Sequence, residues 1–168
     1  MEDASVNHVF MISKNNYTDG TIYKGQFRRD KFDGYGELEQ RDGSKYSGHF
    51  KSGEFEGQGT LVKFERGKKA YQYEGGFAAG LFEGEGKLVY AGGNSYEGGF
   101  RNGKKNGRGI FKYESGDVYE GCFRDDAKED TNCTITRTNG TKYVGGIVND
   151  KYHGRGRLEK SNGEYYEG

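Results

Sequence analysis

The side chains that could support catalysis are few and lie in unrelated positions. The three histidines are His8, His49 and His153, and no motif places a serine, cysteine or aspartate beside any of them. The sequence therefore predicts no nucleophile–base–acid triad. Two cysteines, Cys122 and Cys133, are too few for a disulfide framework or a cysteine-based metal site. We predict no catalytic residue and no metal site, and we do not expect an enzyme.

Two segments match known ligand-binding loops only in part. Residues Gly98–Lys104 come close to the glycine-rich loop that cradles phosphates, but Lys105 replaces the serine or threonine that would bind Mg²⁺. The acidic run 125–130 lacks the ligand spacing and the central glycine of a calcium-binding EF-hand loop. A repeat unit and a solvated loop explain these two segments better, so the sequence predicts no cofactor.

Cys122 and Cys133 fall on the two expected strands of one hairpin, where they could meet in a disulfide. The N-terminus reads Met1-Glu2-Asp3 and shows no basic segment followed by an apolar one, so no secretory signal is recognisable. A cytoplasmic location, which we therefore expect, keeps thiols reduced. We predict two reduced cysteines, with the disulfide as the alternative.

Composition excludes several classes of protein. The chain has 26 basic and 26 acidic residues, and this zero net charge argues against a nucleic-acid binder. No apolar run approaches the ~20 residues of a membrane-spanning helix. Glycine accounts for 31 of 168 residues against a usual ~7%, and 14 Tyr and 11 Phe accompany it. An ordered, aromatic-rich chain with few aliphatic residues indicates a repeat protein.

A repeat of about 23 residues runs through the sequence. Each unit begins with Tyr-x-Gly and continues with Phe two residues later, then a Gly-x-Gly, then Leu or Phe. The tyrosines that begin the units are Tyr23, Tyr46, Tyr73, Tyr96, Tyr119 and Tyr143, and Tyr166 opens a partial unit. We assign residues 17–168 to the repeat array and residues 1–16 to an N-terminal segment, in which residues 9–12 could add a capping strand.

The repeat predicts the fold. Alternation at a period of two makes both halves of a unit β-strands with the aromatic side chains on one face. Dipeptides such as Asp42-Gly43 and Asn139-Gly140 supply the positive φ angles of hairpin turns. A 23-residue unit cannot bury its own face and must stack on its neighbours. We predict an all-β fold: a single-layer, curved antiparallel β-meander solenoid of about six hairpin repeats, roughly 60 Å long at ~4.8 Å per strand.

Two units depart from the pattern. The second carries four extra residues around 65–70, which we expect to form a longer hairpin loop. In the fifth, Asp130 and Asn132 stand where both glycines are expected, so we predict that the curl is interrupted there by a kink or a loosened hairpin. The last residues, 166–168, would form an exposed strand edge. Exposed edges are normally capped or paired, so we expect end-to-end self-association or a partner strand there. The alternative is that the sequence is part of a longer protein.

Residues Tyr96–Gly109 resemble a MORN repeat (membrane occupation and recognition nexus), with its Tyr-Glu-Gly-x-Phe start and later Gly-x-Gly. The resemblance implies a β-meander whose concave groove receives a peptide, a helix or a second copy. The family also carries an older proposal, that the repeats bind phosphoinositides and tether proteins to membranes. Members occur in membrane-junction, ciliary and cytoskeletal proteins and beside catalytic domains.

The aromatic ladder has two interpretations. The rings are either simply the core, or they line a groove, because a single-layer sheet cannot cover this face alone and an exposed apolar stripe marks a binding surface. We predict that a groove binds a partner. Its residues are Tyr46, Phe50, Tyr73, Phe77, Tyr96, Phe100, Tyr119 and Phe123. A channel for single-stranded nucleic acid would need positive charge, and Glu74, Glu97 and Glu120 oppose it.

Basic residues in two units are candidates for contact with lipid headgroups. They are Lys68, Lys69, Lys104 and Lys105, at ~1 kcal/mol each near an anionic surface. Glu54, Glu56, Glu83 and Glu85 occupy comparable positions nearby, so ordinary solvated loops are the simpler interpretation.

The leading hypothesis is a non-catalytic scaffold that binds an extended or helical segment of a partner protein and forms a homodimer through its terminal repeats. The alternatives are a phosphoinositide-dependent membrane tether and the targeting module of a longer enzyme. Association with the cytoskeleton, a cilium or a membrane is an expectation from the resemblance alone.

Overall fold

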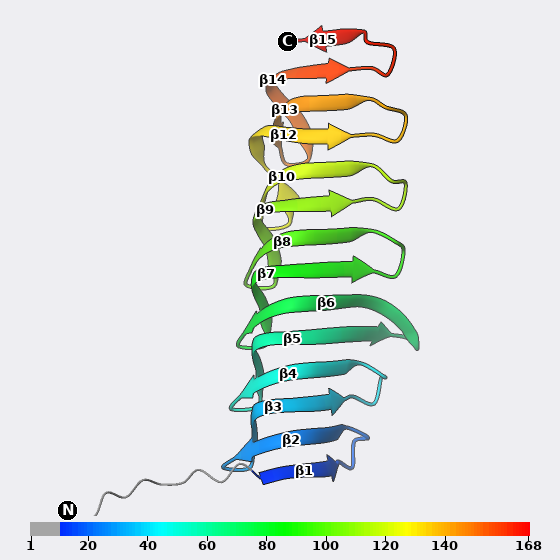
Figure 1. Cartoon of the computed structure of the whole chain (residues 1–168). Helices are drawn as coiled ribbons and strands as arrows, with labels where there is room; N and C mark the ends of the chain where they lie inside the picture. Colours follow the sequence, from blue (N-terminus) through cyan, green and yellow to red (C-terminus); the bar gives the residue numbers. More distant parts are fainter. Residues whose placement is uncertain (1–10) are drawn as a thin grey trace, which may run out of the picture.

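The chain forms one open antiparallel sheet in which nearly every strand pairs with the next one in sequence (Figure 1). A computed structural model describes residues 11–168, and this part contains strands and turns but no helix. The strands follow the order β1 to β10 and then β12 to β15, while the short β11 pairs with β10 beside this path. The predicted all-β meander is confirmed.

The strands of the first three units are β1 Met11–Asn16, β2 Ile22–Arg28, β3 Lys31–Glu39, β4 Lys45–Lys51, β5 Glu54–Glu65, β6 Lys68–Ala78 and β7 Leu81–Tyr90. Those of the remaining units are β8 Ser95–Arg101, β9 Lys104–Lys112, β10 Val118–Arg124, β11 Ala127–Lys128, β12 Asp130–Thr136, β13 Lys142–Val148, β14 Lys151–Glu159 and β15 Tyr165–Glu167.

Two kinds of turn alternate and lie on opposite edges of the sheet. On one edge, two residues with left-handed backbone join the strands, as Ser52 (φ 54°) and Gly53 (φ 95°) join β4 to β5. Two successive positive φ angles give the type I′ turn, whose twist matches that of the strands. We call this edge the tight-turn edge. Its other turns are at 29–30, 79–80, 102–103, 125–126 and 149–150.

The opposite edge carries the glycine turns that the sequence predicts. At one of them, Gly43 has a φ of 86° and donates to the Gln40 carbonyl at 2.9 Å. The Asp42 carboxylate accepts from the backbone N–H of Ser44 at 2.8 Å, which closes the turn with a local side-chain bond. We call this edge the glycine-turn edge.

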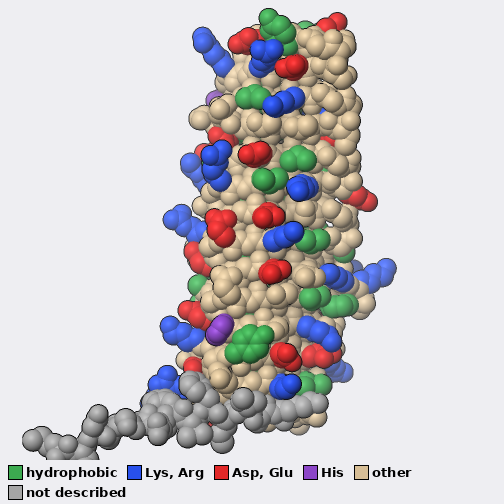
Figure 2. Space-filling view, viewed as in Figure 1, with side chains coloured by type: hydrophobic (Ala, Val, Ile, Leu, Met, Phe, Trp, Pro, Cys, Tyr) green, Lys and Arg blue, Asp and Glu red, His purple; other side chains and the backbone are tan. Residues whose placement is uncertain are grey.

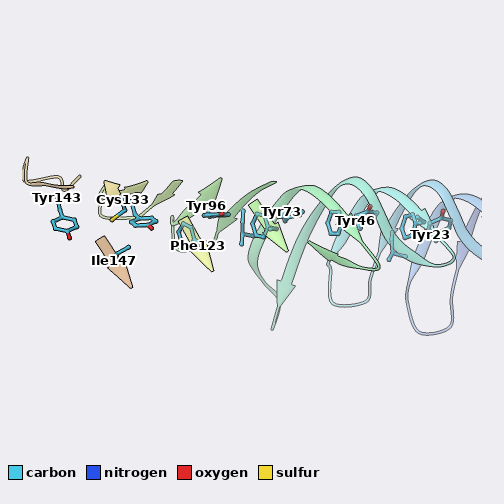
Figure 3. Packing of buried hydrophobic residues seen from close by; sticks show 14 residues of the cluster. Tyr23, Tyr46, Tyr73, Tyr96, Phe123, Cys133, Tyr143 and Ile147 are labelled. Atoms are coloured by element: carbon cyan, nitrogen blue, oxygen red, sulfur yellow. The ribbon is translucent and has the colours of Figure 1, made fainter. Parts of the chain in front are cut away.

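The core lies on one face of this single sheet. The repeat tyrosines pair across the strands with Leu38, Leu61 and Leu88, so rings and leucines form a row along the sheet. Figure 3 shows the labelled tyrosine rings in a line inside the curl of the ribbon. Tyr23, Tyr73, Tyr96 and Tyr119 are each 0% exposed. The curl thus lets one layer enclose its own core.

The paired glycines make room for each tyrosine ring. Gly75 and Gly86 face each other across β6 and β7, and a Cβ atom at Gly86 would lie 2.5 Å from the Tyr73 hydroxyl. The ring therefore covers the glycine pair of its own unit. Its hydroxyl donates to the Gly76 carbonyl at 2.9 Å, which satisfies this buried polar group. Tyr23, Tyr46, Tyr96, Tyr119 and Tyr143 make the same bond to the carbonyl three residues on.

The four extra residues of the second unit do not form a longer loop, so this prediction is wrong. They lengthen both strands, and β5 and β6 meet in a two-residue turn at Arg66 (φ 52°) and Gly67 (φ 74°). The extended hairpin folds beside the preceding glycine turn, because Phe64 donates its N–H to the buried Ser44 hydroxyl at 3.0 Å. Figure 1 shows β6 curving out beyond the other hairpins.

The fifth unit is irregular, but its second glycine position is not where the sequence suggests. Asp130 pairs with Ile147 as a first glycine would, whereas Cys133, not Asn132, pairs with Gly145 in the second glycine position. One additional residue between them creates a bulge. The sheet continues through this unit, although β10 and β12 share only the three residue pairs 118–136, 119–135 and 120–134.

A strand precedes the first unit. β1 pairs antiparallel with β2, with Met11 opposite Phe27 and Asn16 opposite Ile22. Of the residues considered for a capping strand, Met11 and Ile12 lie in β1, whereas Val9 and Phe10 lie outside the described residues.

Candidate interaction surfaces

The structure brings no catalytic or metal-binding set together in residues 11–168. His49 lies in β4 and His153 in β14, ten strands further along, and His8 lies outside the described residues. No group of His, Cys, Asp and Glu that could hold a metal occurs in this part of the chain. None of its elements is a helix that could cross a membrane.

The segments that resemble ligand loops have structural roles. Gly98–Lys104 spans the end of β8, a tight turn and the start of β9, with no helix after it. In the acidic run, the Asp130 carboxylate accepts from the N–H groups of Cys122 at 2.8 Å and Asn132 at 2.9 Å. These bonds help hold the pKa of Asp130 below its usual value although burial opposes them.

The two cysteines lie on opposite faces of the sheet. Cys133 is 0% exposed and belongs to the core, whereas Cys122 lies between the core residues Gly121 and Phe123 and so faces the other way. Both thiols are free. Burial raises the pKa of Cys133 to about 11 and also raises that of Cys122, which lowers the thiolate fraction of each near neutral pH.

The structure places the predicted groove residues in the core. None of the eight is more than 4% exposed; they are Tyr46, Phe50, Tyr73, Phe77, Tyr96, Phe100, Tyr119 and Phe123. Because each phenylalanine meets the tyrosine of the preceding unit edge-on, the rings fill the space between units: Phe77 lies 5.2 Å from Tyr46 and Phe100 lies 5.1 Å from Tyr73. These side chains stabilise the rod and leave no open groove between the rings.

A second aromatic position, which sequence reasoning missed, completes this packing. Phe32, Phe55 and Phe82 stack on Tyr23, Tyr46 and Tyr73 with ring centroids 3.7–3.8 Å apart and nearly parallel planes. The signal was available, because each phenylalanine lies nine residues after its tyrosine. The fourth and fifth units have no phenylalanine at this position.

Lys105 and Lys128 take this stacking position in the fourth and fifth units. The Lys105 ammonium lies 5.6 Å from the Phe111 ring centroid and 3.4 Å from the Asp126 carboxylate, and its side chain is 14% exposed. The Lys128 ammonium lies 5.4 Å from the Tyr119 centroid and 3.3 Å from Asp150. Lys105 is therefore engaged in the fold and is poorly placed to contact a lipid headgroup.

The remaining predicted headgroup lysines do not form one site. Lys68 and Lys69 begin β6 at the glycine-turn edge, where the extended hairpin ends, whereas Lys104 begins β9 at the tight-turn edge. All three are exposed, and the Lys69 ammonium donates to the Gln72 side chain at 3.0 Å. The length of a strand separates the two groups of lysines.

The face opposite the core is the exposed face of the sheet, which we call the outer face. In Figure 2, acidic and basic side chains are interspersed over the face shown. Ladders such as Glu74–Lys87–Glu97 across β6, β7 and β8 produce this alternation. Mixed charge of this kind favours no strongly basic or acidic partner on the outer face.

A hollow of about 560 Å³ lies on the outer face over β2 to β5. Its side chains include the apolar Ile22 and Val62 and the polar Ser47 and Thr60, with two lysines and two glutamates between them. Beside it, Tyr35 is 51% exposed, and its hydroxyl lies 2.8 Å from the Ser47 hydroxyl, with either as donor.

The exposed Tyr35 ring is held in place by its neighbours. It meets the His49 ring edge-on at 5.7 Å, and its backbone N–H donates to the Gln26 side chain at 2.9 Å. An exposed aromatic ring fixed beside an open hollow is a common feature of protein-binding surfaces.

The chain belongs to the MORN repeat family. The sequence profile of this repeat matches residues 23–45, 46–63, 73–95, 96–118 and 143–165. The unmatched unit at 119–142 is the one that holds the bulge between Asp130 and Cys133. No curated protein has a significantly similar sequence.

Among solved structures, the fold is similar to the SAS-4 (dCPAP) TCP domain of Drosophila melanogaster in complex with a proline-rich motif of Ana2 (dSTIL). The two share 13% sequence identity with a TM-score of 0.52, and the match covers 100% of this chain and 94% of that chain. At this identity the likeness concerns the fold.

Proposed function

We propose that this chain is a non-catalytic scaffold that binds an extended segment of a partner protein on its outer face. The observation that carries the proposal is the open hollow beside Tyr35. The core rings are buried inside the rod and cannot contact a ligand. The hollow, together with the exposed ring of Tyr35, is therefore the surface that best fits one. Aromatic anchors of this type commonly dominate the affinity of an interface.

Two further features support an extended ligand. Lys24, Lys45, Glu37 and Glu39 contribute equal numbers of positive and negative charges to the hollow, which suits a segment of low charge. The structural neighbour binds a proline-rich motif, and such motifs dock as extended helices on aromatic surfaces. A proline-rich segment is therefore the first ligand class to test.

The experiment is a selection of proline-rich peptides from a displayed library on the wild-type chain, followed by affinity measurements. Tyr35→Ala should weaken the selected peptides by about 10-fold or more. Tyr152→Ala, which removes a ring of the same 51% exposure in β14, is the matched control. Equal affinity for wild type and Tyr35→Ala would refute the hollow as the binding site.

The alternative of a phosphoinositide-dependent tether would use Lys68 and Lys69 on the extended hairpin. Their exposure supports this candidate, whereas the engagement of Lys105 removes one of the four lysines first proposed. Co-sedimentation with phosphoinositide vesicles that is lost in a Lys68→Ala/Lys69→Ala variant would favour the tether over the scaffold.

Self-association through the terminal strands is a separate part of the proposal. Tyr165 and Tyr166 of β15 are 57% and 60% exposed, so this end of the rod presents apolar surface. Sedimentation equilibrium of the wild type and of Tyr166→Arg measures whether this surface forms a homodimer.

A further inference from the structure

Lysines on the outer face over β3 to β8 lie opposite glutamates. Lys45 faces Glu39 in the register of β3 and β4, and Lys87 faces Glu97 in that of β7 and β8. The ammonium groups approach these carboxylates to 3.4 and 4.0 Å. Opposite charges on neighbouring strands stabilise a sheet. The fold itself therefore supplies a partner for each of these lysines.

Two lysines further along the outer face have no such partner. Lys112 in β9 has uncharged residues opposite it on both neighbouring strands. Lys142 in β13 lies opposite Glu159, but the Glu159 carboxylate pairs with Arg157 at 3.6 Å. Both lysines are exposed, and neither forms an ion pair within residues 11–168. Their charges remain available to an anionic group from outside.

The two lysines end one cross-strand row, which we call the lysine row. In this row, Lys112 is followed by Val118 in β10, Thr136 in β12 and Lys142 in β13. Neighbouring strands lie ~4.8 Å apart, so about 14 Å separates the backbones of the two lysines. Val118 is half-buried and Thr136 is exposed. The row therefore presents a cation, two β-branched side chains and a second cation.

The adjacent row limits how acidic a ligand can be. It contains Ile110, which is 37% exposed, then Glu120, Thr134 and Val144. The upper half of Figure 2 shows hydrophobic side chains beside basic and acidic ones on this face. A uniformly acidic segment would approach the Glu120 carboxylate and be repelled. The surface suits a segment that carries acidic residues only at two separate positions.

An extended chain matches the length of the lysine row. In a strand, alternate side chains point to the same side and lie ~6.6 Å apart, so residues i, i+2 and i+4 span ~13 Å. Residues i and i+4 would then reach the two lysines, and residue i+2 would lie over the β-branched pair. An α-helix returns to the same side after seven or eleven residues, at ~10.5 or ~16.5 Å, and matches the row less well.

We propose that the lysine row binds an extended segment of a partner protein with the pattern acidic–x–apolar–x–acidic. The two carboxylates pair with Lys112 and Lys142, and the apolar side chain packs on Val118 and on the methyl group of Thr136. The row crosses β9 to β13, whereas the hollow of the proposed function lies over β2 to β5. The two surfaces are separate, so either can fail without the other.

The test compares two peptides of identical composition by NMR titration of the isotope-labelled chain, at low and at physiological salt. The matched peptide contains Glu-Thr-Leu-Thr-Glu, and the mismatched one contains Glu-Glu-Thr-Thr-Leu between the same flanking residues. The matched peptide should bind about 5-fold more tightly at low salt, because only it reaches both lysines. It should shift amide signals of β9, β10, β12 and β13. Equal affinities would overturn the proposal.

A matched pair of variants identifies the row. Lys112→Gln/Lys142→Gln should weaken the matched peptide by about 5-fold at low salt and by less at physiological salt, because salt screens exposed charges. Lys24→Gln/Lys45→Gln removes the same charge from the outer face over β2 and β4 and should leave the affinity within about 2-fold. Circular dichroism confirms that both variants are folded. Similar losses in both would overturn the proposal in favour of net charge.

The apolar position and membranes provide the remaining outcomes. Replacing the leucine of the matched peptide by serine should weaken binding by about 3-fold at both salt concentrations, because the lost contact is apolar. Unchanged affinity would overturn the proposed pattern. Vesicles of phosphatidylcholine and phosphatidylserine test the other anionic partner. Sedimentation with these vesicles that Lys112→Gln/Lys142→Gln abolishes, together with no peptide binding, would overturn the proposal and identify a membrane-binding surface.

Discussion

The first three repeat units and the next two solve the same packing problem with different chemistry. In the first three, a phenylalanine stacks on the repeat tyrosine, as Phe82 does on Tyr73 at 3.7 Å. In the fourth and fifth, a lysine occupies this position, with its ammonium near the rings and paired with an aspartate. We call units one to three, which are closed by apolar contact, the first half, and units four and five, which are closed by an ion pair over aromatic rings, the second half. In the sixth unit an aromatic residue returns, since Tyr152 lies 4.2 Å from Tyr143.

The hydrogen bonds between units reverse direction at the same boundary. In the first half, an acidic side chain in the strand accepts from the next tight turn, as Glu83 accepts from the Asn102 N–H at 3.0 Å. In the second half the acid lies in the turn and accepts from the strand, as Asp126 accepts from the Lys105 N–H at 3.0 Å. The carboxylate changes place, but a charge-assisted bond joins the units in both halves.

The backbone explains why both solutions are possible. At every junction from the first unit to the sixth, a turn N–H donates to the carbonyl of the residue in the stacking position, whether this is Phe82 (2.9 Å) or Lys105 (3.0 Å). This bond does not depend on the side chain. The comparison shows that the backbone sets the position and that the side chain determines how the junction responds to pH, salt and substitution.

Alkaline pH should have the largest effect, and it should affect both halves together, because both bury their tyrosines. Burial raises the pKa of Tyr23 and Tyr46 to about 12 and raises that of Tyr73, Tyr96 and Tyr119 further. The fold binds the neutral phenol, whose pKa in an unfolded chain is about 10. Stability is therefore complete below pH ~10 and is lost as the pH rises through 12.

Absorbance at 295 nm reports tyrosinate, and far-UV circular dichroism reports the fold. The ionisation of the buried tyrosines should coincide with the loss of the sheet above pH ~10. Ionisation of all the tyrosines near pH ~10 with the sheet intact would contradict the shared buried ladder.

Truncation of the stacking residue should destabilise the first half more than the second. Phe82→Ala should lower the free energy of unfolding by about 3 kcal/mol, because it leaves a cavity against Tyr73. Lys105→Ala should lower it by about 1 kcal/mol, since an ion pair contributes less than a stacked ring. Urea denaturation of both variants measures the difference. Equal losses would mean that the two chemistries are energetically equivalent.

Exchange of the residue should convert one half into the other. Lys105→Phe should raise the free energy of unfolding by about 1 kcal/mol, because it replaces a lysine that is only 14% exposed with a ring that can stack on Tyr96 as Phe82 stacks on Tyr73. The reverse change, Phe82→Lys, should be destabilising, since its neighbouring turn has Asn102 and Gly103 and supplies no aspartate. Thermal unfolding monitored by circular dichroism checks both. A destabilised Lys105→Phe would show that the second half depends on its ion pairs.

Salt should have the smallest effect, and only on the second half. Raising the ionic strength screens the ion pairs Lys105–Asp126 and Lys128–Asp150 and should lower the contribution of each to the free energy of unfolding by about a few tenths of a kcal/mol. Hydrogen exchange of the amides of β9 and β11 should speed up slightly, while exchange in β3, β5 and β7 stays constant. A uniform change along the rod would remove this distinction between the halves.

The sequence is sufficient to predict the sheet and its tyrosine ladder, because Tyr73, Gly75 and Gly86 recur at fixed spacing and each has a steric reason to do so. It does not reveal whether the ladder stays open to a partner, since exposure depends on how far the sheet curls. Nor does it reveal the role of Lys105. In the sequence Lys105 is one of several basic residues near a turn, and only the register places it over Phe111.

Irregular positions are the hardest to predict. A motif aligned by counting places the second missing glycine at residue 132, but the bulge shifts it to Cys133, whose small side chain fits against Gly121. The extra residues near 65–70 contain few strand-forming side chains, yet the turn at Arg66 and Gly67 lets both strands extend. Local composition could not decide between a loop and a longer ladder.

The extended β5–β6 hairpin also makes one repeat unit of the rod different from all the others. A perfectly periodic rod offers the same face every two strands, so a long ligand could slide by one unit and bind in several equivalent frames. The hairpin breaks this translational symmetry at one place, where Lys63 reaches Asp42 at 2.8 Å over the neighbouring turn. A long ligand that contacts this hairpin is therefore fixed in one register along the rod and cannot shift by a repeat unit.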